Sequence, residues 1–264
     1  MNHSTLRLDG HNILITGVSR PLGIGATLAK RFAEAGARVA IHGFSAYDLA
    51  VGHKSARANG TALLEKQLTA QGLHVSALAP GDLAVPGVAE QLVDEAAAKL
   101  GGLHGMVLNH AYSTYGELGD WTPEHIDPHL IVNVRASMMM VQSFANQADP
   151  TRDNAITLFT SGQYLGPMVN EIAYCVSKEA IIALCRQASY LLGERSIRVN
   201  CINPGPNDTG YCFGEAYEAV ANSFPSGRWG RPDDTADLAL FLHSSYGKWI
   251  TGQLIASEGG FRRS

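Results

Sequence analysis

The chain has 264 residues, of which 45% are hydrophobic and 17% charged, and its formal net charge is −4. This mildly acidic balance lacks the broad basic field of nucleic-acid-binding proteins, so we expect no nucleic-acid partner. The four cysteines form no CxxC pair and the ten histidines no HxH or HExxH motif, which argues against a disulfide framework and a metal site. No apolar run reaches the roughly 18 residues of a membrane span, and residues 1–10 lack an apolar signal core. We therefore expect a soluble, cytoplasmic protein without a membrane partner.

Short apolar runs alternate with longer helical patterns along the chain. In chain order, strands are predicted at 12–16, 38–42, 73–79, 104–108, 155–160, 197–202 and 253–256. The helices predicted between them are 22–36, 61–71, 88–100, 124–146, 171–192 and 232–243. Strands separated by helices cannot form hairpins, and they pair in parallel through right-handed crossovers. The sequence therefore predicts a single α/β domain over residues 1–264, a doubly wound (Rossmann) parallel sheet of seven strands with helices on both faces.

Two longer segments show no clear periodicity. One covers residues 43–60, after the second predicted strand, and the other covers residues 204–230 and is rich in Gly, Pro and aromatic residues. Segments of this length without regular structure are often lids or binding loops. We predict both as irregular loops with a role in binding.

A glycine-rich turn, Thr16–Gly25, lies between the first predicted strand and the first predicted helix. Gly17 permits a sharp turn, while Gly23 and Gly25 let the backbone approach a pyrophosphate, which the free N–H groups of the helix N-terminus would hold. A tight turn without a ligand is the alternative for a glycine cluster alone. The position directly after an N-terminal apolar strand favours a nucleotide site.

The end of the second predicted strand indicates which dinucleotide would bind. An acidic residue there normally contacts the ribose hydroxyls of NAD, but this strand ends at His42 and no carboxylate follows until Asp48. Arg20, inside the glycine turn, could instead pair with the 2′-phosphate of NADP. We therefore favour NADP, with NAD as the alternative and with a merely solvated Arg20 as the other interpretation of that residue.

A tyrosine and a lysine lie four residues apart near the start of the predicted helix 171–192. Tyr174 and Lys178 would share one helix face, and a nearby positive charge lowers the pKa of a phenol. Such a tyrosine could exchange the proton that accompanies hydride transfer at a carbonyl. Ser161 follows a strand end, where ligands bind in open α/β sheets, and could orient the substrate oxygen. Taken alone, the Tyr–Lys pair is a common structural pair on helices.

Together these motifs resemble the short-chain dehydrogenase/reductase family over essentially the whole chain. The matching segments are Thr16–Gly25, Asp82-Leu83, Asn109–Ala111, Asn133, Ser161, Tyr174-x-x-x-Lys178, Asn203-Pro-Gly205 with Thr209, and Ile250–Gly252 with Glu258–Gly260. Within the family, the chain looks like the loosely defined subgroup labelled 3-oxoacyl-[acyl-carrier-protein] reductases. One departure is that five residues separate Gly17 from Gly23, where the family has three.

The resemblance implies an NAD(P)-dependent oxidoreductase that interconverts a secondary alcohol and a ketone. It implies that Tyr174 is the general acid/base, that Lys178 binds the nicotinamide ribose and lowers the pKa of Tyr174, that Ser161 orients the substrate, and that Asn133 fixes a relay water. The implied cofactor-binding residues are Gly17, Ser19, Arg20, Gly23, Ile24, Gly25, Asp82, Leu83, Asn109, Ala111, Tyr174, Lys178, Pro204, Gly205 and Thr209.

The resemblance also predicts partners and assembly. The substrate would be a small alcohol or ketone, covered by the segment 204–230. Helices 124–146 and 171–192 would form the contacts of a homodimer or homotetramer. A dinucleotide-binding sensor or interaction protein that has lost catalysis is the alternative function, motivated by the altered glycine spacing.

Overall fold

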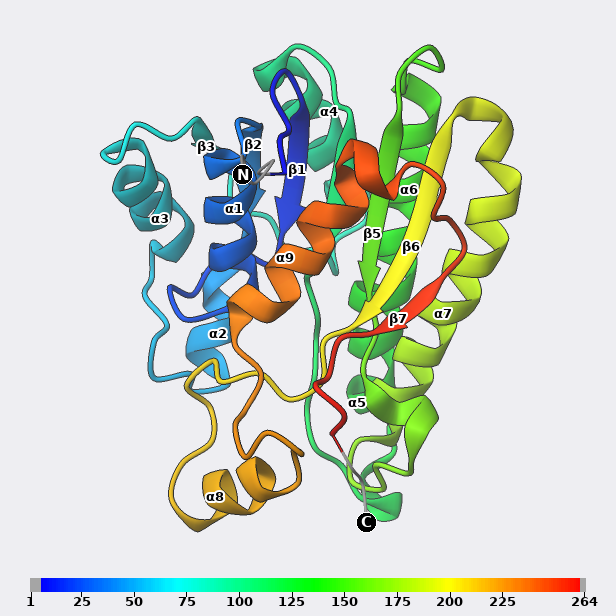
Figure 1. Ribbon diagram of the computed structural model, residues 1–264. Helices are drawn as coiled ribbons and strands as arrows, with labels where there is room; N and C mark the ends of the chain where they lie inside the picture. Colours follow the sequence, from blue (N-terminus) through cyan, green and yellow to red (C-terminus); the bar gives the residue numbers. More distant parts are fainter. Residues whose placement is uncertain (1–5, 262–264) are drawn as a thin grey trace.

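Seven parallel strands form one sheet in the order β3-β2-β1-β4-β5-β6-β7 (Figure 1). The computed structural model describes residues 6–261. The strands are β1 (Asn12–Thr16), β2 (Arg38–His42), β3 (Val75–Ala77), β4 (Gly105–Leu108), β5 (Asn154–Phe159), β6 (Ile197–Asn203) and β7 (Leu254–Ala256). The predicted doubly wound parallel sheet is confirmed, and strands 12–16 and 38–42 have the predicted bounds.

The strand order reverses next to β1, whose neighbours are β2 on one side and β4 on the other. Every residue of β1, β4, β5 and β6 is buried, as expected for parallel strands covered on both faces. In open parallel sheets, a ligand cleft forms at the carboxyl ends of the strands where the order reverses. The fold therefore places a cleft beyond Thr16, His42 and Leu108.

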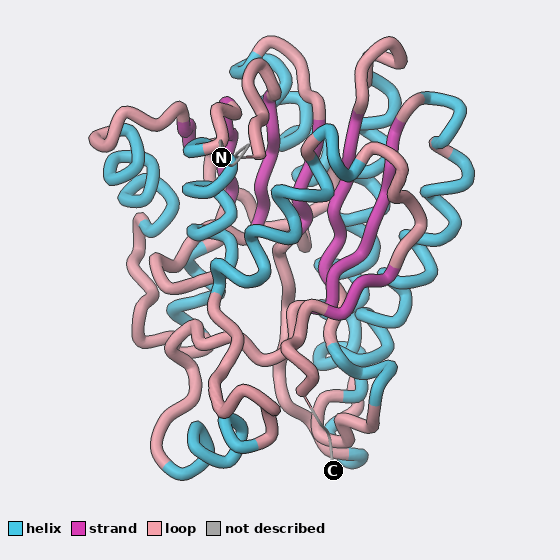
Figure 2. Tube along the Cα trace, in the orientation of Figure 1, coloured by secondary structure: helices cyan, strands magenta, loops and turns pink. Residues whose placement is uncertain are grey.

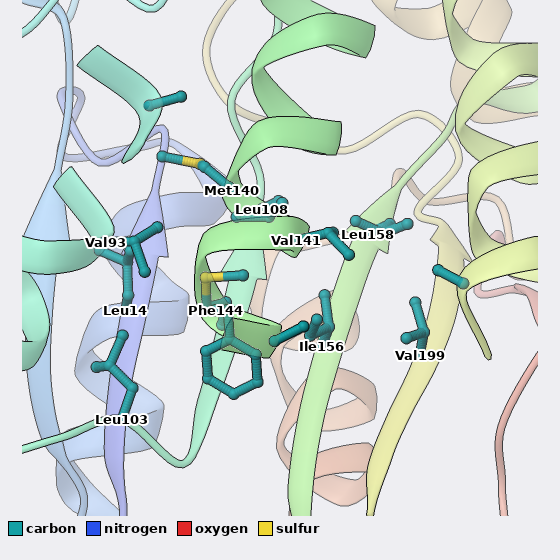
Figure 3. Packing of buried hydrophobic residues seen from close by; sticks show 14 of the residues in the cluster. Leu14, Val93, Leu103, Leu108, Met140, Val141, Phe144, Ile156, Leu158 and Val199 are labelled. Atoms are coloured by element: carbon teal, nitrogen blue, oxygen red, sulfur yellow. The ribbon is translucent and has the colours of Figure 1, made fainter. Parts of the chain in front are cut away.

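Helices cover both faces of the sheet, and Figure 2 shows the two helical layers on either side of the strands. On one face lie α1 (Ile24–Glu34), α3 (Gly60–Thr69) and α9 (Pro232–His243), which share a core cluster with alternate residues of β1 and β2. On the other face lie α4 (Val88–Leu100), α6 (Ala136–Gln147) and α7 (Ile172–Leu191). This second cluster contains Met140 and Phe144 of α6; Met140 lies beside Leu108 of β4, and Phe144 lies towards Ile156 of β5 (Figure 3).

The helix predicted at 124–146 is divided into three parts. An α-helix, α5 (Pro123–Pro128), leads into a π-helical segment, η2 (His129–Arg135), which continues as α6. Asn133 lies in this π-helical segment and is buried. Single π-turns inside helices are rare and occur often at functional sites.

Two further differences concern the segments predicted to be irregular. Residues 43–60 contain a short helix, α2 (Ser45–Ala50), and residues 204–230 contain α8 (Glu215–Asn222). The six residues of α2 are too few to show a helical period.

The strand predicted at 73–79 is shorter in the structure, where it is β3. This strand pairs only with β2, at the edge of the sheet.

Candidate active site

Two adjoining cavities lie beyond the carboxyl ends of the strands. The glycine-turn cavity, about 610 Å³, is lined by residues of the glycine turn and of the loops that follow β2, β3 and β4. The tyrosine cavity, about 910 Å³, is lined by Ser161, Tyr174 and residues of the 204–230 segment. Tyr47, His53 and Ser113 line both cavities and so form their common wall.

The structure divides the predicted site residues among these cavities. Those that line the glycine-turn cavity are Gly17, Ser19, Arg20, Gly23, Ile24, Asp82, Leu83, Asn109, Ala111 and Thr209. Those that line the tyrosine cavity are Ser161, Tyr174 and Gly205. The residues that line neither cavity are Gly25, Asn133, Lys178 and Pro204.

The glycine turn packs so closely against the end of β4 that only glycine fits. Gly17 has a φ of +73°, and a Cβ on it would lie 2.8 Å from Asn109 Nδ2. The same amide donates to the carbonyl oxygens of Gly17, at 3.1 Å, and Thr16, at 3.3 Å. A Cβ on Gly25 would collide with the carbonyl oxygen of Gly17. Asn109 therefore holds the turn in shape, and its side chain is committed to the turn backbone.

Asp48, the first carboxylate after the end of β2, lies in α2 and lines the glycine-turn cavity. Asp48 is buried, accepts a hydrogen bond from the Ser19 hydroxyl, and lies 3.4 Å from Arg20 Nε. Arg20 is thus neither solvated nor free. Its Nη1 is buried and has no hydrogen-bond partner within the described residues, and burial lowers the pKa of the guanidinium.

The end of β2 has no room for the acidic residue that contacts NAD ribose in related sites. A Cβ on Gly43 would lie 2.5 Å from the carbonyl oxygen of Val18 and 2.6 Å from Thr61 Oγ1. His42, just before it, is buried, and its Nε2 donates to the carbonyl oxygen of Gly81 at 3.0 Å. Its Nδ1 is left as a buried acceptor without a partner, beside the glycine-turn cavity.

Ser161 and Tyr174 meet at the tyrosine cavity. Ser161 follows β5, Tyr174 lies in the first turn of α7, and both side chains line this cavity. Lys178, one turn further, lies on the same side as predicted, with Nζ 5.6 Å from the centre of the Tyr174 ring. Its ammonium donates to the carbonyl oxygen of Phe159 at 2.9 Å.

The expected lowering of the Tyr174 pKa by Lys178 is not found. Burial raises the pKa of Tyr174 well above its usual value, and the hydrogen bond from Ser161 opposes this effect only in part. Burial also lowers the pKa of Lys178 to about 8. Burial is the largest cause of both shifts, because it disfavours the charged form of each side chain.

The Asn133 side chain is hydrogen-bonded to the backbone of the loop after β4. Its side-chain oxygen accepts from the Tyr112 amide at 2.7 Å, and its Nδ2 donates to the Tyr112 carbonyl at 2.9 Å and to Ser177 Oγ at 2.8 Å. The side chain thus ties together the loop and α7, which carries Tyr174. The predicted relay water on Asn133 stays a prediction.

Comparison with known proteins decides the family. The family model described as "Enoyl-(Acyl carrier protein) reductase" matches residues 17–262. A relative from Bacillus subtilis (strain 168), named "Uncharacterized oxidoreductase YjdA", is 32% identical over all of both chains. This chain belongs to the short-chain dehydrogenase/reductase family. It is accordingly an oxidoreductase.

Other members of the short-chain dehydrogenase/reductase family are similarly close. The galactitol 2-dehydrogenase of Agrobacterium fabrum is 31% identical, over 97% of this chain and 98% of that protein. A solved structure of a short-chain dehydrogenase from Burkholderia cenocepacia J2315, in complex with NADP, is 32% identical and has a TM-score of 0.84. The match covers 96% of this chain and 98% of that one.

Sequence reasoning missed two residues of this family member's cleft. The Tyr47 hydroxyl donates to the Ser113 carbonyl at 2.8 Å and accepts from the Ser113 amide at 2.9 Å, so α2 is fastened across the cleft. Glu171 lines the tyrosine cavity beside Tyr174. No local pattern indicates the contact of Tyr47, because its partner is 66 positions away. Glu171 could have been found from its spacing, since residues three apart on a helix are neighbours.

Two absences hold for the part of the chain that the structure describes. Within residues 6–261, no helix has both the length and the apolar character needed to cross a membrane. Over the same range, no cluster of three or more His, Cys, Asp or Glu side chains has the arrangement of a metal site.

Proposed function

We propose that the protein interconverts a secondary alcohol and a ketone, with NADP(H) as the preferred dinucleotide and NAD(H) as the alternative. The observation that carries this proposal is that Ser161 and Tyr174 line one cavity, which adjoins the cavity of the glycine turn. A phenol and a hydroxyl on the wall of one cavity are suited to bind one substrate oxygen between them.

The residues of the glycine-turn cavity fit a dinucleotide. The turn leaves space where side chains would collide, and its peptide groups lie at the N-terminus of α1, where anions are favoured. Two buried polar atoms at this cavity, Arg20 Nη1 and His42 Nδ1, have no hydrogen-bond partner among residues 6–261, and a phosphate and a ribose or base donor would satisfy them. When bound, the dinucleotide supplies or accepts a hydride at the substrate carbon.

In the direction of reduction, side chains of this protein bind the substrate oxygen and protonate it. Ser161 donates a hydrogen bond to the carbonyl oxygen and polarises it. As the hydride adds to the carbon with its electron pair, the O–H bond of Tyr174 breaks and its proton moves to the oxygen, which gives a neutral alcohol. The tyrosinate left behind lies near the Lys178 ammonium and recovers a proton from water. In oxidation the same groups act in reverse.

The preference for NADP(H) rests on Arg20. Asp48 occupies the Nε side of this guanidinium and leaves Nη1 without a partner. A 2′-phosphate is an acceptor of matching charge for that N–H, and Gly43 excludes the acidic side chain that NAD ribose would use. The NADP bound in the Burkholderia relative is consistent with this choice.

We also propose that the chain forms a homodimer or homotetramer through α6 and α7. Of three consecutive methionines on α6, Met140 is buried in the core whereas Met138 is 52% exposed. On α7, Val176 is 56% exposed, two residues from Tyr174. Exposed apolar side chains on these helices are consistent with subunit contacts.

A coupled assay tests the proposed reaction. Oxidation of NADPH and of NADH is followed with a panel of ketones, and reverse reduction is followed with the matching alcohols. We expect turnover with some ketones and a higher kcat/KM for NADPH than for NADH. Tight NADPH binding without turnover of any panel member would instead support the non-catalytic sensor.

A further inference from the structure

Glu171 brings a carboxylate into the wall of the tyrosine cavity. It directly precedes the first residue of α7, three residues before Tyr174, its side chain makes no capping hydrogen bond, and it lines the same cavity as Tyr174 and Ser161. Its charge raises the pKa of both Tyr174 and Tyr211, so the carboxylate is close enough to both phenols to interact with them. The group therefore faces the space where the proposed substrate reacts.

The Glu171 carboxylate makes few polar contacts with the described residues. Within residues 6–261 its side chain accepts one long hydrogen bond, from Ser113 Oγ at 3.5 Å, and no ion pair includes it. Burial raises the pKa of Glu171, which means that the site desolvates the carboxylate without pairing it. A half-buried carboxylate of this kind is an unmet hydrogen-bond acceptor.

The rest of the cavity is mainly apolar and aromatic. Its lining includes Tyr115, Met168, Tyr211, Phe213 and Phe261. Lys54 is the one lysine or arginine among the described lining residues, and its Nζ lies 3.8 Å from the centre of the Phe213 ring. A cationic substrate would therefore meet a like charge in the cavity, whereas a neutral hydroxyl group would not.

We propose that Glu171 accepts a hydrogen bond from a hydroxyl group on the carbon next to the reacting carbon. The preferred substrates are then α-hydroxy ketones with an apolar or aromatic substituent, and the corresponding vicinal diols. Glu171 and Tyr174 line the same cavity and lie close enough to interact electrostatically, so the two groups can bind two neighbouring oxygens of one substrate. This inference rests on the proposed function and adds a specificity-determining residue to it.

The test compares ketones that differ in one group. The probes are 2-hydroxyacetophenone, which has the donor, and 2-methoxyacetophenone, which keeps an oxygen at the same carbon but cannot donate. A third probe, 2-aminoacetophenone, presents an ammonium. Each is assayed with NADPH on the wild type, Glu171→Ala, Glu171→Gln and a matched control, Glu194→Gln, an exposed glutamate beyond the far end of α7.

We expect Glu171→Ala to lower kcat/KM for the hydroxy ketone by about 10- to 100-fold, the range for a lost hydrogen bond to a charged group. The methoxy ketone should change less than about twofold. Glu171→Gln keeps an acceptor oxygen and should fall between the two, while Glu194→Gln should match the wild type. Thermal unfolding and NADPH binding of each variant verify that the fold and the dinucleotide site are intact.

Three results would overturn the inference. The first is an equal loss with the hydroxy and methoxy ketones, which would make Glu171 structural. The second is no loss with either, and the third is a wild-type preference for the amino ketone that the variants abolish, which would make the site cationic in specificity. If the wild type reduces none of the three ketones or the wider panel, the proposed reaction itself fails, and the inference with it.

Discussion

The Arg20 guanidinium is only partly satisfied by the residues that the structure describes. Asp48 pairs with its Nε, and these residues give Nη1 no partner in a cavity that would hold a dinucleotide. The sequence could place Arg20 in the glycine turn, because that position is local. It could not show that Asp48 returns to the same place, because α2 folds back onto the turn only in three dimensions.

Replacing Arg20 by alanine should separate the two dinucleotides. We expect KM for NADPH to rise about 10- to 100-fold, because one charge-assisted hydrogen bond to the 2′-phosphate is lost, and KM for NADH to change much less. Steady-state kinetics with each dinucleotide measure this. Arg57→Ala, an exposed arginine that lines neither cavity, is the control. Equal increases for both dinucleotides would show that Arg20 only shapes the turn.

For Tyr174 and Lys178, sequence spacing predicts the relative position of the two side chains but not the pKa of the tyrosine. Their four-residue separation predicted a common helix face, and the ammonium does lie 5.6 Å from the ring centre. The direction of the Tyr174 pKa shift was predicted wrongly, because burial is a property of the packed molecule and not of the spacing. Glu171 adds to the upward shift, and its position three residues earlier was readable from the sequence.

At the scale of elements, α2 is held over the cleft by two side chains. Asp48 accepts from Ser19 and pairs with Arg20, and Tyr47 bonds to the backbone of Ser113. The six-residue helix has too few turns for intrinsic stability. These tertiary contacts therefore determine whether it stays folded.

Asp48→Ala should release α2. We expect faster amide hydrogen exchange over residues 45–51 and a loss of about 1–3 kcal/mol in the free energy of unfolding, because two buried donors lose their acceptor. Hydrogen exchange followed by mass spectrometry measures the first effect and urea unfolding the second. Unchanged exchange in this helix would mean that Tyr47 alone suffices to hold it.

The helix predicted at 124–146 shows the same limit of local patterns. Its apolar period is real, and its ends were predicted to within one residue. The π-helical segment inside it accompanies contacts between Asn133 and Tyr112, which lies in another part of the chain. The sequence thus predicted which strands and long helices form, because their periodicity is local, and missed what long-range hydrogen bonds determine.

At the scale of the whole molecule, buried neutral histidines couple stability to pH. Burial lowers the pKa of His42 to about 4 and that of His110 and His243 to about 3. The unfolded chain binds protons at these histidines below a pH of about 6.5, whereas the folded chain does not until far lower. Folding is therefore opposed by protonation, and stability falls as the pH falls from about 6.5 towards 4.

Urea unfolding as a function of pH measures this dependence. Each such histidine contributes a slope of up to about 1.4 kcal/mol per pH unit inside that window. His243→Gln removes one proton site at a position that bonds to Thr157 Oγ1, at 3.1 Å. Its slope between pH 6.5 and 4 should be smaller than that of the wild type, whatever its absolute stability. An unchanged slope would show that His243 does not contribute to the acid sensitivity.

The proposed assembly is also a property of the whole molecule. Val176 is 56% exposed on α7, and a subunit contact there would bury it. We expect Val176→Glu to shift the chain towards monomers in analytical ultracentrifugation, because a charge would be buried in an apolar contact. The control is Leu63→Glu, which changes an exposed leucine on α3, outside the proposed contact. A wild-type sample that sediments as a monomer at micromolar concentration would refute the assembly.

The central claim is that the Tyr174 phenol transfers the proton at the substrate oxygen, and Tyr174→Phe tests it most directly. The measurement pairs NADPH binding, by fluorescence titration, with kcat for the best ketone of the panel. The account predicts a dissociation constant within about threefold of the wild type and a kcat lowered by about 100-fold or more, the usual contribution of general acid catalysis. Turnover close to that of the wild type would contradict it.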